Sequence, residues 1–512
     1  MKLIPRTRGG ALWRFLLGAV IVIGATAGTT AVAGLLQFKQ LAADISLTPA
    51  LPNANVTLPN PGQPQTIMII GSDHRAGEPF RSAQTDTILL VRLNGSSQTI
   101  NVLSVPRDLE VNIPGVGQAK INSAYSTGGP NLLVKVLRQQ VFPGLHVNHI
   151  VDINFGGFED LVNAIGCVYA DVDHRYYNVS ALGPNDFSSI NIQPGYQKLC
   201  GPQALQFVRF RHTDSDLVRN ARQQDFIRWA KDQYGVDNLI ANRDKLLRIF
   251  GAHTVTDHNL HTLDGLINLF NLVAFSDGHT IKQIKFPAQF LPCDSTGVGG
   301  VPCYVAPTST GAEHGAFRAF MHVTHSVPKA KHPSFARRGH HSNRISTAGL
   351  TADTTDGKAQ AQAVRGAHMP IYYPKLITSA EGSGYCTSAT ANCDDGAEPE
   401  TAYEGSYPRA YHIRDQQGHL HSAYRITLVL NALLGEYYGV QGTTWSSPPL
   451  LGSPSGTKVV HGRKLFLYAQ GGSLTNVAWH TPQGVYWISN TLTTDLTNQQ
   501  MVAIASSLTR GA

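Results

Sequence analysis

Four arginines and two aspartates lie close together between residues 205 and 224. They are Arg209, Arg211, Arg219 and Arg222, with Asp214 and Asp216 between them. Neighbouring guanidinium groups repel one another unless an anion lies among them, and the planar fork of arginine binds phosphate oxygens two at a time. The stretch therefore indicates a site for a phosphate ligand with at least two negative charges. The alternative is an Arg/Asp network on the surface of an amphipathic helix, which is a common structural arrangement.

Two elements must position these arginines. Apolar and polar residues alternate from Val208 to Arg211, which predicts a strand with Arg209 and Arg211 on one face. Asp216 then stands where the N-cap of a helix is expected. On that helix, residues at i, i+3, i+4 and i+7 share one stripe, namely Arg219, Arg222, Gln223 and Phe226.

A second group of charged residues follows three expected strands earlier in the chain. The strands are Thr66–Ile70, Thr87–Leu93 and Ile100–Val105, with a tight turn at Asn94-Gly95. If neighbouring strands are antiparallel, the end of the first, the start of the second and the end of the third meet at one rim. The charged residues expected at that rim are Asp73, Arg75, Asp86, Arg107 and Asp108.

Asp73 and Asp86, with the hydroxyls of Ser72 and Thr87, make a set of hard oxygen donors suited to Mg²⁺. Taken singly, each aspartate is more often a turn or cap residue. A divalent cation beside a cage of arginines is what a pyrophosphate needs, because together they neutralise the charge that builds on the leaving group in phosphoryl transfer.

Five motifs occur in order across these elements. They are Gly71-Ser72-Asp73-His74-Arg75, Thr85-Asp86-Thr87, Ser104-Val105-Pro106-Arg107-Asp108, Lys120-Ile121-Asn122-Ser123-Ala124-Tyr125 with Gly128-Gly129, and Val208-Arg209-Phe210-Arg211 leading to Asp216-Leu217-Val218-Arg219-Asn220-Ala221-Arg222-Gln223-Gln224. Together they resemble the LytR–CpsA–Psr family. The resemblance covers residues 65–305. One departure is the sequence Ser82-Ala83-Gln84-Thr85, where the family usually has Arg-Ser directly before the aspartate.

The resemblance implies a layered α/β domain, with a central mixed sheet flanked by helices. It also implies an enzyme that transfers a glycopolymer from a polyprenyl-pyrophosphate carrier to peptidoglycan through a phosphodiester. The apolar faces of two expected helices, Asp237–Phe250 and Leu263–Val273, would then enclose the prenyl chain, although such faces are more often plain core.

The resemblance also assigns residue roles. Asp73 and Asp86 would hold Mg²⁺, and Asp216 would order the arginines. The residues expected to grip the pyrophosphate are Arg75, Arg107, Arg209, Arg211, Arg219 and Arg222, with Gln223 assisting. Those expected to act in catalysis are Arg107, Asp108, Arg209, Arg211 and Asp216. The general base is left open between Asp108 and Asp214.

The N-terminus indicates the compartment. No charged residue occurs from Phe15 to Phe38, which is long enough to cross a hydrocarbon core of roughly 30 Å. Basic residues precede this stretch, so the positive-inside rule puts residues 1–14 in the cytoplasm and the rest of the chain outside the cell membrane. A cleaved signal peptide ending near Ala31-Val32-Ala33 is the alternative, but the apolar stretch is long for one.

Six cysteines fit an oxidising compartment and structural disulfides. Fifteen pairings are possible, and the simplest joins neighbours, with Cys293 to Cys303 and Cys386 to Cys393. Cys167 and Cys200 are then left as the third pair. None of the six has metal-ligand spacing with histidines.

A chain of 512 residues is too long for one core, which predicts several segments. We expect residues 39–64 to form a Pro-rich spacer. From His314 to Ala352 there is no acidic residue but there are six Lys/Arg and six His, which predicts a flexible basic linker over 306–368. Residues 369–512 are expected to form a small α+β domain of unknown role, with strands such as Tyr424–Leu430 and a closing helix, Thr497–Leu508.

Other functions remain open on the sequence alone. The same site could hydrolyse a polyprenyl pyrophosphate, or the protein could be a non-catalytic, membrane-tethered lipid- or wall-binding protein. The net charge of +7 and pI near 9.0 would suit an anionic partner. Nucleic acid is the weakest candidate partner, because zinc-finger spacing and basic–aromatic interleaving are lacking and the folded part is expected outside the cytoplasm.

Overall fold

A computed structural model of the chain describes residues 50–51, 54–58, 63–74, 83–93, 99–178, 189–210, 215–276, 279–291, 304–322, 346–386 and 408–511. The predicted membrane segment, 15–38, lies outside these ranges, as do Arg75, Arg211 and Asp214. Among the residues described, no helix combines the length and the hydropathy needed to cross a bilayer.

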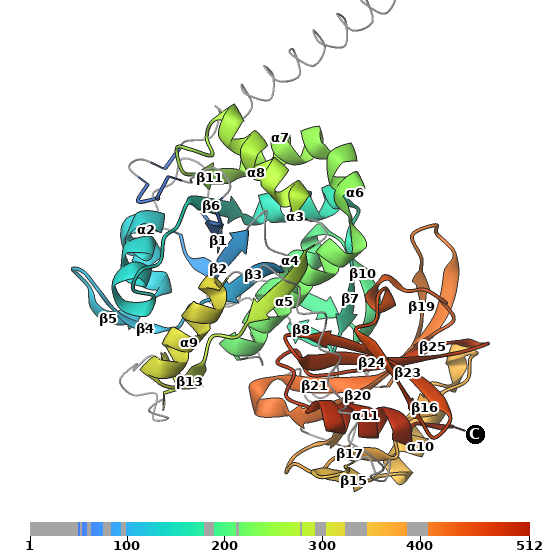
Figure 1. Cartoon of the computed structure of the whole chain (residues 1–512). Helices are drawn as coiled ribbons and strands as arrows, with labels where there is room; N and C mark the ends of the chain where they lie inside the picture. Colours follow the sequence, from blue (N-terminus) through green and yellow to red (C-terminus); the bar gives the residue numbers. More distant parts are fainter. Residues whose placement is uncertain are drawn as a thin grey trace, which may run out of the picture.

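A six-stranded mixed sheet organises the first half of the chain (Figure 1). Its order is β11-β6-β1-β2-β3-β12, with β1/β6 and β3/β12 parallel and the other neighbours antiparallel. The strands are β1 Gln65–Ser72, β2 Thr85–Leu93, β3 Thr99–Ser104, β6 His149–Asn154, β11 Thr254–Thr256 and β12 Thr280–Ile284. The three expected strands are therefore present, and β1, β2 and β3 are antiparallel neighbours as the rim argument required.

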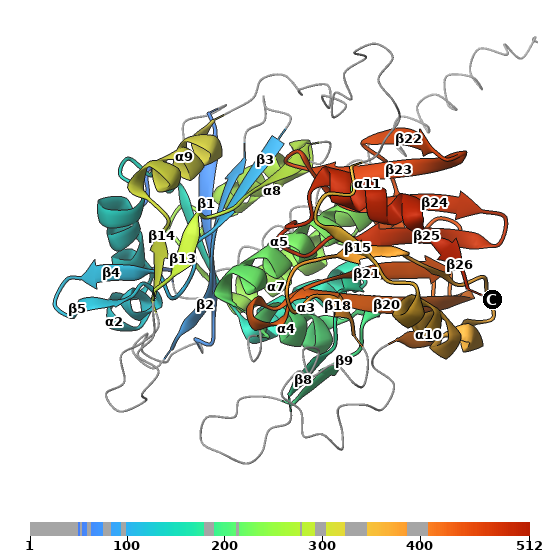
Figure 2. The same ribbon diagram turned by 90° about the horizontal axis from the view of Figure 1, so that it is seen from below.

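Both faces of this sheet are covered, which is why β1 and β2 are apolar on both sides. Met68 and Leu90 pack with α2 (Asn122–Val136) and α9 (Thr310–Met321) on one face. Ile67 and Val91 pack with α7 (Arg243–His253) and α8 (Leu263–Phe275) on the other, where α5 (Asp216–Gln233) also contacts β3 (Figure 2). The described chain is thus a mixed α/β protein with a central mixed sheet flanked by helices.

Helices and short strands complete this half. The helices are α2 Asn122–Val136, the π-helical turn η2 Leu137–Val141, α3 Phe155–Ile165, α4 Gly201–Arg209, α5 Asp216–Gln233, α6 Val236–Ala241, α7 Arg243–His253, α8 Leu263–Phe275 and α9 Thr310–Met321. The short strands are β4 Glu110–Ile113, β5 Gly117–Lys120, β7 Val168–Val172, β8 Tyr176–Asn178, β9 Ile190–Ile192, β10 Gly195–Leu199, β13 Ala288–Phe290 and β14 Val305–Pro307.

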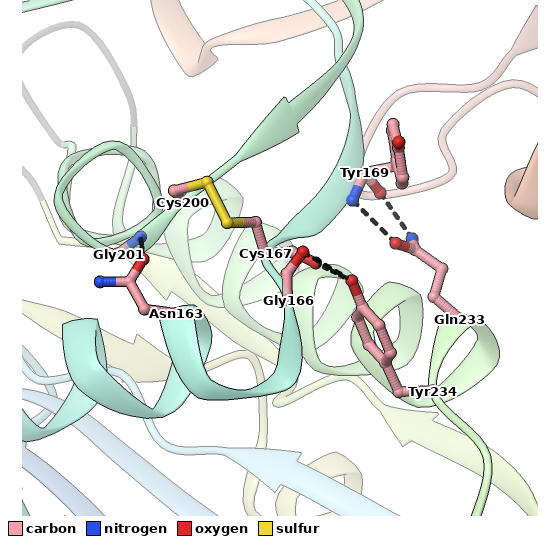
Figure 3. Close-up of a disulfide and its surroundings, with 8 residues drawn as sticks. All are labelled: Asn163, Gly166, Cys167, Tyr169, Cys200, Gly201, Gln233 and Tyr234. Atoms are coloured by element: carbon pink, nitrogen blue, oxygen red, sulfur yellow. Dashed lines mark hydrogen bonds between the residues drawn. A yellow bond between two sulfur atoms is a disulfide. The ribbon is translucent and has the colours of Figure 1, made fainter. Parts of the chain in front are cut away.

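The disulfide between Cys167 and Cys200 positions α4. It joins the end of α3 to the residue that caps the start of α4, with a Cα–Cα distance of 4.4 Å (Figure 3). Asn163 Oδ1 accepts the Gly201 N–H at 2.9 Å beside it. The Cys167–Cys200 disulfide, which was expected once the other four cysteines had been paired with their neighbours, is therefore confirmed. Cys386 is also disulfide-bonded, whereas Cys293, Cys303 and Cys393 lie outside the described residues.

The chain ends in a second, antiparallel sheet of eight strands. Its path is β18-β20-β21-β25-β24-β23-β22, and β19 also pairs with β20. The strands are β18 Gly384–Tyr385, β19 Arg409–Arg414, β20 Leu420–Asn431, β21 Glu436–Thr443, β22 Gly456–Val460, β23 Arg463–Gln470, β24 Ser473–Thr481 and β25 Gly484–Ser489. Elements packed around it are β15 Leu350–Ala352, α10 Thr355–Ala363, η3 Arg365–Ala367, β16 Tyr372–Tyr373, β17 Leu376–Thr378, η5 Ala432–Leu434, η6 Pro449–Leu451, α11 Asn498–Ser507 and β26 Thr509–Arg510.

The two halves share a hydrophobic cluster. Tyr169 of β7 and Tyr196 of β10 pack there against Trp445, Tyr411 and Trp487 from the C-terminal part. A buried salt bridge joins Arg425 of β20 to Asp171 of β7 at 3.0 Å. We call this contact the seam. Its burial means that the C-terminal part is docked onto the first half.

The predicted linker over 306–368 is wrong at both ends. Residues 310–321 form α9, where Phe320 is fully buried and its carbonyl accepts a hydrogen bond from Asn101 at 2.8 Å. Residues 350–367 belong to the C-terminal part, because β15 pairs with β17 and Val364 lies in its core. A composition rich in Ala, Gly and basic residues hid two short helices, each held by a few buried side chains. Residues 323–345 lie outside the described part.

Candidate active site

A β-bulge sets the position of Asp86. Gly71 pairs with Thr87 and Ser72 with Thr85, so Asp86 is the extra residue on β2. An extra residue interrupts the alternation of a strand and can re-aim a side chain. Asp73 lies at the same end, where its N–H donates to the Gln84 carbonyl at 3.2 Å and its Oδ1 accepts the Gln84 N–H at 2.5 Å.

Two arginines from distant elements bind the Asp86 carboxylate. Arg107, in the loop after β3, donates from Nη1 to Oδ1, and Arg209, the last residue of α4, donates from Nε to Oδ2 at 3.0 Å. Burial favours the neutral acid, but the nearby charges of Arg219, Arg209 and Arg107 outweigh it and lower the pKa of Asp86. The carboxylate is therefore ionised and lies among three guanidinium groups.

A second carboxylate, Asp216, orders this group. Its Oδ2 accepts the backbone N–H of Arg107 at 3.0 Å, and its Oδ1 pairs with Arg219 one turn along α5. Both side chains are almost fully buried. The expected helix cap is wrong by one residue: Ser215 caps α5 by accepting the Val218 N–H at 3.2 Å. Because Ser215 supplies the cap, the Asp216 carboxylate is directed at the arginines.

The expected strand at Val208–Arg211 is wrong, because Val208 and Arg209 end helix α4. A short alternating run is ambiguous between strand and helix, and here a disulfide-bonded residue and Pro202 start a helix nine residues long. Arg209 still reaches the site from the helix end, and its guanidinium lies 3.8 Å from the centre of the Phe155 ring.

Arg222 is more deeply buried than a side chain that contacts a ligand needs to be. It is fully buried, and its Nη1 donates to the carbonyls of Phe207 and Phe210 at 3.0 and 2.9 Å. Its Nε donates to the Tyr176 hydroxyl at 3.2 Å. These contacts hold the end of α4, and hence Arg209, in place.

Gln223 ties the neighbouring elements together. Its Nε2 donates to Thr87 Oγ1 at 2.8 Å and to the Val208 carbonyl at 3.1 Å. The stripe of Arg219, Arg222, Gln223 and Phe226 therefore faces inward, as its spacing predicts, and all four side chains are buried.

Asp108, one of the two candidates for the general base, is buried beside cations. Its Oδ1 lies 3.2 Å from Lys120 Nζ and 3.8 Å from Arg107 Nε. Lys120 comes from one of the matched motifs, so the structure brings two of the five motifs together at this point. The other candidate, Asp214, lies outside the described residues.

Sequence reasoning missed a buried carboxyl group beside this site. Asp152 of β6 accepts hydrogen bonds from the hydroxyls of Ser72 at 2.7 Å and Tyr125 at 2.6 Å. Burial raises the pKa of Asp152 despite these two donors. The available signal was one Asp between two apolar residues, Val151 and Ile153, inside an expected strand. Such a residue needs partners, and Ser72 and Tyr125 both belong to the matched motifs.

The donor set at the bulge suits a hard cation in kind. Asp73 is exposed, and each Asp86 oxygen that binds an arginine keeps a second lone pair. In the part of the chain that is described, three or more His, Cys, Asp or Glu side chains are nowhere gathered in a metal-binding arrangement. A metal here would thus rest on the two aspartates, with hydroxyls, water or ligand oxygens completing its shell.

A carboxylate held by several arginines, on a mixed α/β domain, defines a candidate site for an anionic ligand. Comparison with known proteins identifies the family in which this site occurs. The LytR_cpsA_psr family matches residues 36–313, which is more than half of the chain. The chain belongs to this family, as its five motifs predicted.

Among its relatives is the Oceanobacillus iheyensis polyisoprenyl-teichoic acid–peptidoglycan teichoic acid transferase TagU, 33% identical over 236 residues, which are 43% of this chain and 69% of that protein. TagT of Bacillus subtilis, named for the same transfer, is 30% identical over 257 residues, 46% of this chain and 79% of that protein. A solved structure of TagT with bound octaprenyl pyrophosphate lipid aligns with 52% of this chain and 93% of that chain, at 22% identity and a TM-score of 0.37.

Proposed function

We propose that this protein is a phosphotransferase that attaches a glycan or anionic wall polymer, carried on a polyprenyl pyrophosphate, to peptidoglycan through a phosphodiester bond. The observation that carries the proposal is the Asp86 carboxylate bound by Arg107 and Arg209, with Arg219 close by. The relatives named as teichoic acid transferases support the same donor and acceptor.

The arginines at Asp86 are arranged for an anion. In this structure the carboxylate of Asp86 occupies the place between Arg107 and Arg209. A pyrophosphate carries more charge and more oxygens than one carboxylate, so it competes well with Asp86 for the guanidinium groups of both arginines. We expect substrate binding to draw Arg107 and Arg209 from Asp86 to phosphate oxygens. Asp216 then keeps the Arg107 backbone and Arg219 in place.

Release of Asp86 from the arginines gives it a second role. Asp86 and Asp73 would hold Mg²⁺ at the bulge, with the neighbouring hydroxyls. When bound, the cation neutralises charge on the phosphate oxygens. Arg222 and Gln223 act from below the site, because their bonds to α4 and β2 hold Arg209 and the bulge in register.

The reaction exchanges one P–O bond for another. The acceptor hydroxyl oxygen attacks the phosphorus that bears the glycan, and the bond from that phosphorus to the bridging oxygen of the pyrophosphate breaks. Prenyl phosphate leaves with the bridging oxygen, and the hydroxyl proton passes to a base. Asp108 is our candidate for that base. Arg107 and Arg209 stabilise the charge on the leaving phosphate.

The proposed reaction also requires a particular location for the protein. We propose that residues 15–38 anchor the protein in the cell membrane as a single uncleaved helix, with the N-terminus in the cytoplasm and the catalytic domain outside. A lipid-linked donor and a wall acceptor meet only there.

The test is an assay with the full chain in detergent, carrier-linked glycan and peptidoglycan fragments. We expect glycan–peptidoglycan conjugate, with prenyl phosphate released in equal amount and transfer by Arg209→Ala lowered about 10²–10³-fold. Free phosphoglycan without conjugate would identify a hydrolase instead. Carrier binding with no turnover, unaffected by Arg209→Ala, would identify a non-catalytic binding protein.

A further inference from the structure

A cavity lined by both polar and apolar side chains lies where the C-terminal part meets the catalytic domain. Its volume is about 450 Å³, within the range of roughly 300–1,000 Å³ typical of small-molecule sites. Helix α5 and the segment after β12 form one wall, and loops of the C-terminal part around Glu436, Gly471 and Asp495 form the other. In Figure 2, α5 lies between the two sheets.

The cavity is adjacent to the arginine site. Ser215, on its wall, is next in sequence to Asp216, which binds Arg219 and the Arg107 backbone. Ser104, also on its wall, ends β3 three residues before Arg107. A ligand held here would therefore lie close to the phosphates in the proposed reaction.

The lining differs in kind from the arginine site. Most of its side chains are hydroxyls, carboxamides and carboxyls, and among the described lining residues the one cation is Lys285. Glu436 hydrogen-bonds with Asp495, and Asp495 also accepts a hydrogen bond from Thr491 at 2.9 Å. Two carboxyl groups against one amine disfavour a phosphate. The mixture of polar and apolar side chains suits a ligand with both kinds of surface better than a purely apolar prenyl chain, which would leave the polar groups without partners.

Glu436 adds a hydrogen-bond donor. Burial, and then the neighbouring Asp495 carboxylate, raise the pKa of Glu436 to about 7, while Lys285 and Thr493 act in the opposite direction. Near neutral pH a large share of Glu436 is therefore a neutral acid, which can donate a hydrogen bond as well as accept one.

Apolar side chains complete the lining, among them two phenylalanines. Phe286 is buried, whereas Phe290 is 45% exposed and leaves part of its ring open to a ligand. A sugar ring has the properties that this lining matches: neutral hydroxyls around its edge, which pair with amides and carboxyls, and an apolar C–H face, which packs on an aromatic ring.

We propose that this cavity is a carbohydrate subsite, which binds a sugar of the acceptor glycan strand and presents the strand to the arginine site. The assignment of the sugar to the acceptor rests on the proposed function. The site itself is formed with residues of the C-terminal part, which gives that part a direct share in substrate recognition.

Glycan binding by the full chain in detergent tests the proposal without turnover. The probe is a soluble peptidoglycan disaccharide–peptide, followed by saturation-transfer NMR and calorimetry. We expect Phe290→Ala and Glu436→Ala each to weaken binding about tenfold, because each removes a group that would contact the sugar, whereas Val459→Ala, at an exposed site on β22, leaves it unchanged. Inorganic pyrophosphate binding should be the same in all three variants, because the arginines are intact.

The outcomes separate the two proposals. Unchanged glycan affinity in both cavity variants, or no glycan binding by the wild type at millimolar concentration, would overturn the subsite even if transfer is observed. Loss of glycan binding in the variants supports it even if no transfer is found. Competition by the donor glycan, released from its carrier, in place of the peptidoglycan fragment keeps the carbohydrate subsite and moves it to the donor.

Discussion

Two networks of arginines and aspartates in this molecule, one at the seam and one around Asp86, contain the same chemical groups but have different roles. At the seam, Arg425 is fully buried, pairs with Asp171 at 3.0 Å, and donates to Ser489 Oγ at 2.8 Å and the Asp173 carbonyl at 3.1 Å. Trp487 Nε1 donates to the other oxygen of Asp171 at 3.1 Å. One cation faces one carboxylate, and water is excluded.

Around Asp86 the balance differs. Three guanidinium groups act on its carboxylate, and the side chains of Asp86, Arg107 and Arg209 keep 15%, 19% and 31% of their exposure. Solvent access allows a ligand to enter, and the excess of cations favours an anion. A network that is closed to solvent and has equal numbers of cations and carboxylates therefore holds the fold together, whereas an open network with an excess of cations is suited to binding an anionic ligand.

The largest effect on stability should come from the seam. Arg425→Met leaves the buried Asp171 carboxylate without its charge partner, which costs about 3–5 kcal/mol in similar cases. Urea unfolding followed by tryptophan fluorescence, with Trp487 at the seam, measures it. Arg414→Met, on an exposed residue of the neighbouring strand β19, is the control and should change the free energy of unfolding by less than about 0.5 kcal/mol. Equal effects in the two variants would contradict the role given to the seam.

Arg209→Ala should show the reverse pattern. We expect transfer activity to fall by about 10²–10³, the usual effect of removing one donor from a transition-state site. The free energy of unfolding should change by less than about 1 kcal/mol, because Arg209 is partly exposed. Activity and urea unfolding are measured on the same preparation, with the exposed Arg318→Ala of α9 as control. A destabilisation as large as that of Arg425→Met would mean that the two networks do not differ.

Much of this comparison could be predicted from sequence. Three expected strands, taken as antiparallel neighbours, placed Asp86 and Arg107 at one rim, and helical spacing put Arg219 and Arg222 on one face. Both inferences use only residues that are close together along the chain. The bulge at Asp86 could not be predicted in this way, because it appears only when β1 and β2 are paired.

The seam was beyond sequence reasoning for a related reason. Arg425 and Asp171 are 254 positions apart, and neither lies in a recognisable motif. The buried Asp152 left a visible signal, but its partners Ser72 and Tyr125 come from two other segments. The strand expected at Val208–Arg211 was wrong because a disulfide and a proline, rather than the local pattern, determine helix α4.

The Asp86→Asn variant tests whether the Asp86 carboxylate competes with pyrophosphate for Arg107 and Arg209. Without Mg²⁺, the variant should bind inorganic pyrophosphate roughly tenfold more tightly than the wild type, about 1.4 kcal/mol, because no carboxylate occupies the arginines. Addition of Mg²⁺ should then improve binding in the wild type but not in the variant. Calorimetry with and without Mg²⁺ measures both, and Asp160→Asn, an exposed residue of α3, is the control. Weaker binding by Asp86→Asn without metal would contradict the account.

The smallest effect is a difference in pH dependence between Asp86 and Asp152. The pKa of Asp86 is lowered in the folded state, so its stabilisation is present above its ordinary pKa of 3.8 and is lost as the pH falls below that value. The pKa of Asp152 is raised, so its contribution is fully present below 3.8 and is lost as the pH rises through the higher folded value.

Relative to the wild type, Asp86→Asn should therefore become more stable as the pH falls, and Asp152→Asn more stable as it rises. Urea unfolding at a series of pH values from about 3 to 7 measures the two slopes. Slopes of the same sign would show that the two carboxyl groups do not differ in the way described.

A structure of the full chain with a short-chain prenyl pyrophosphate and Mg²⁺ would test most directly whether the arginines around Asp86 bind the pyrophosphate. We expect phosphate oxygens to contact Arg107 and Arg209. Asp86 should turn away from the arginines and bind the metal together with Asp73, and Asp216 should still pair with Arg219. A pyrophosphate bound elsewhere, with Asp86 still paired to both arginines, would contradict this expectation.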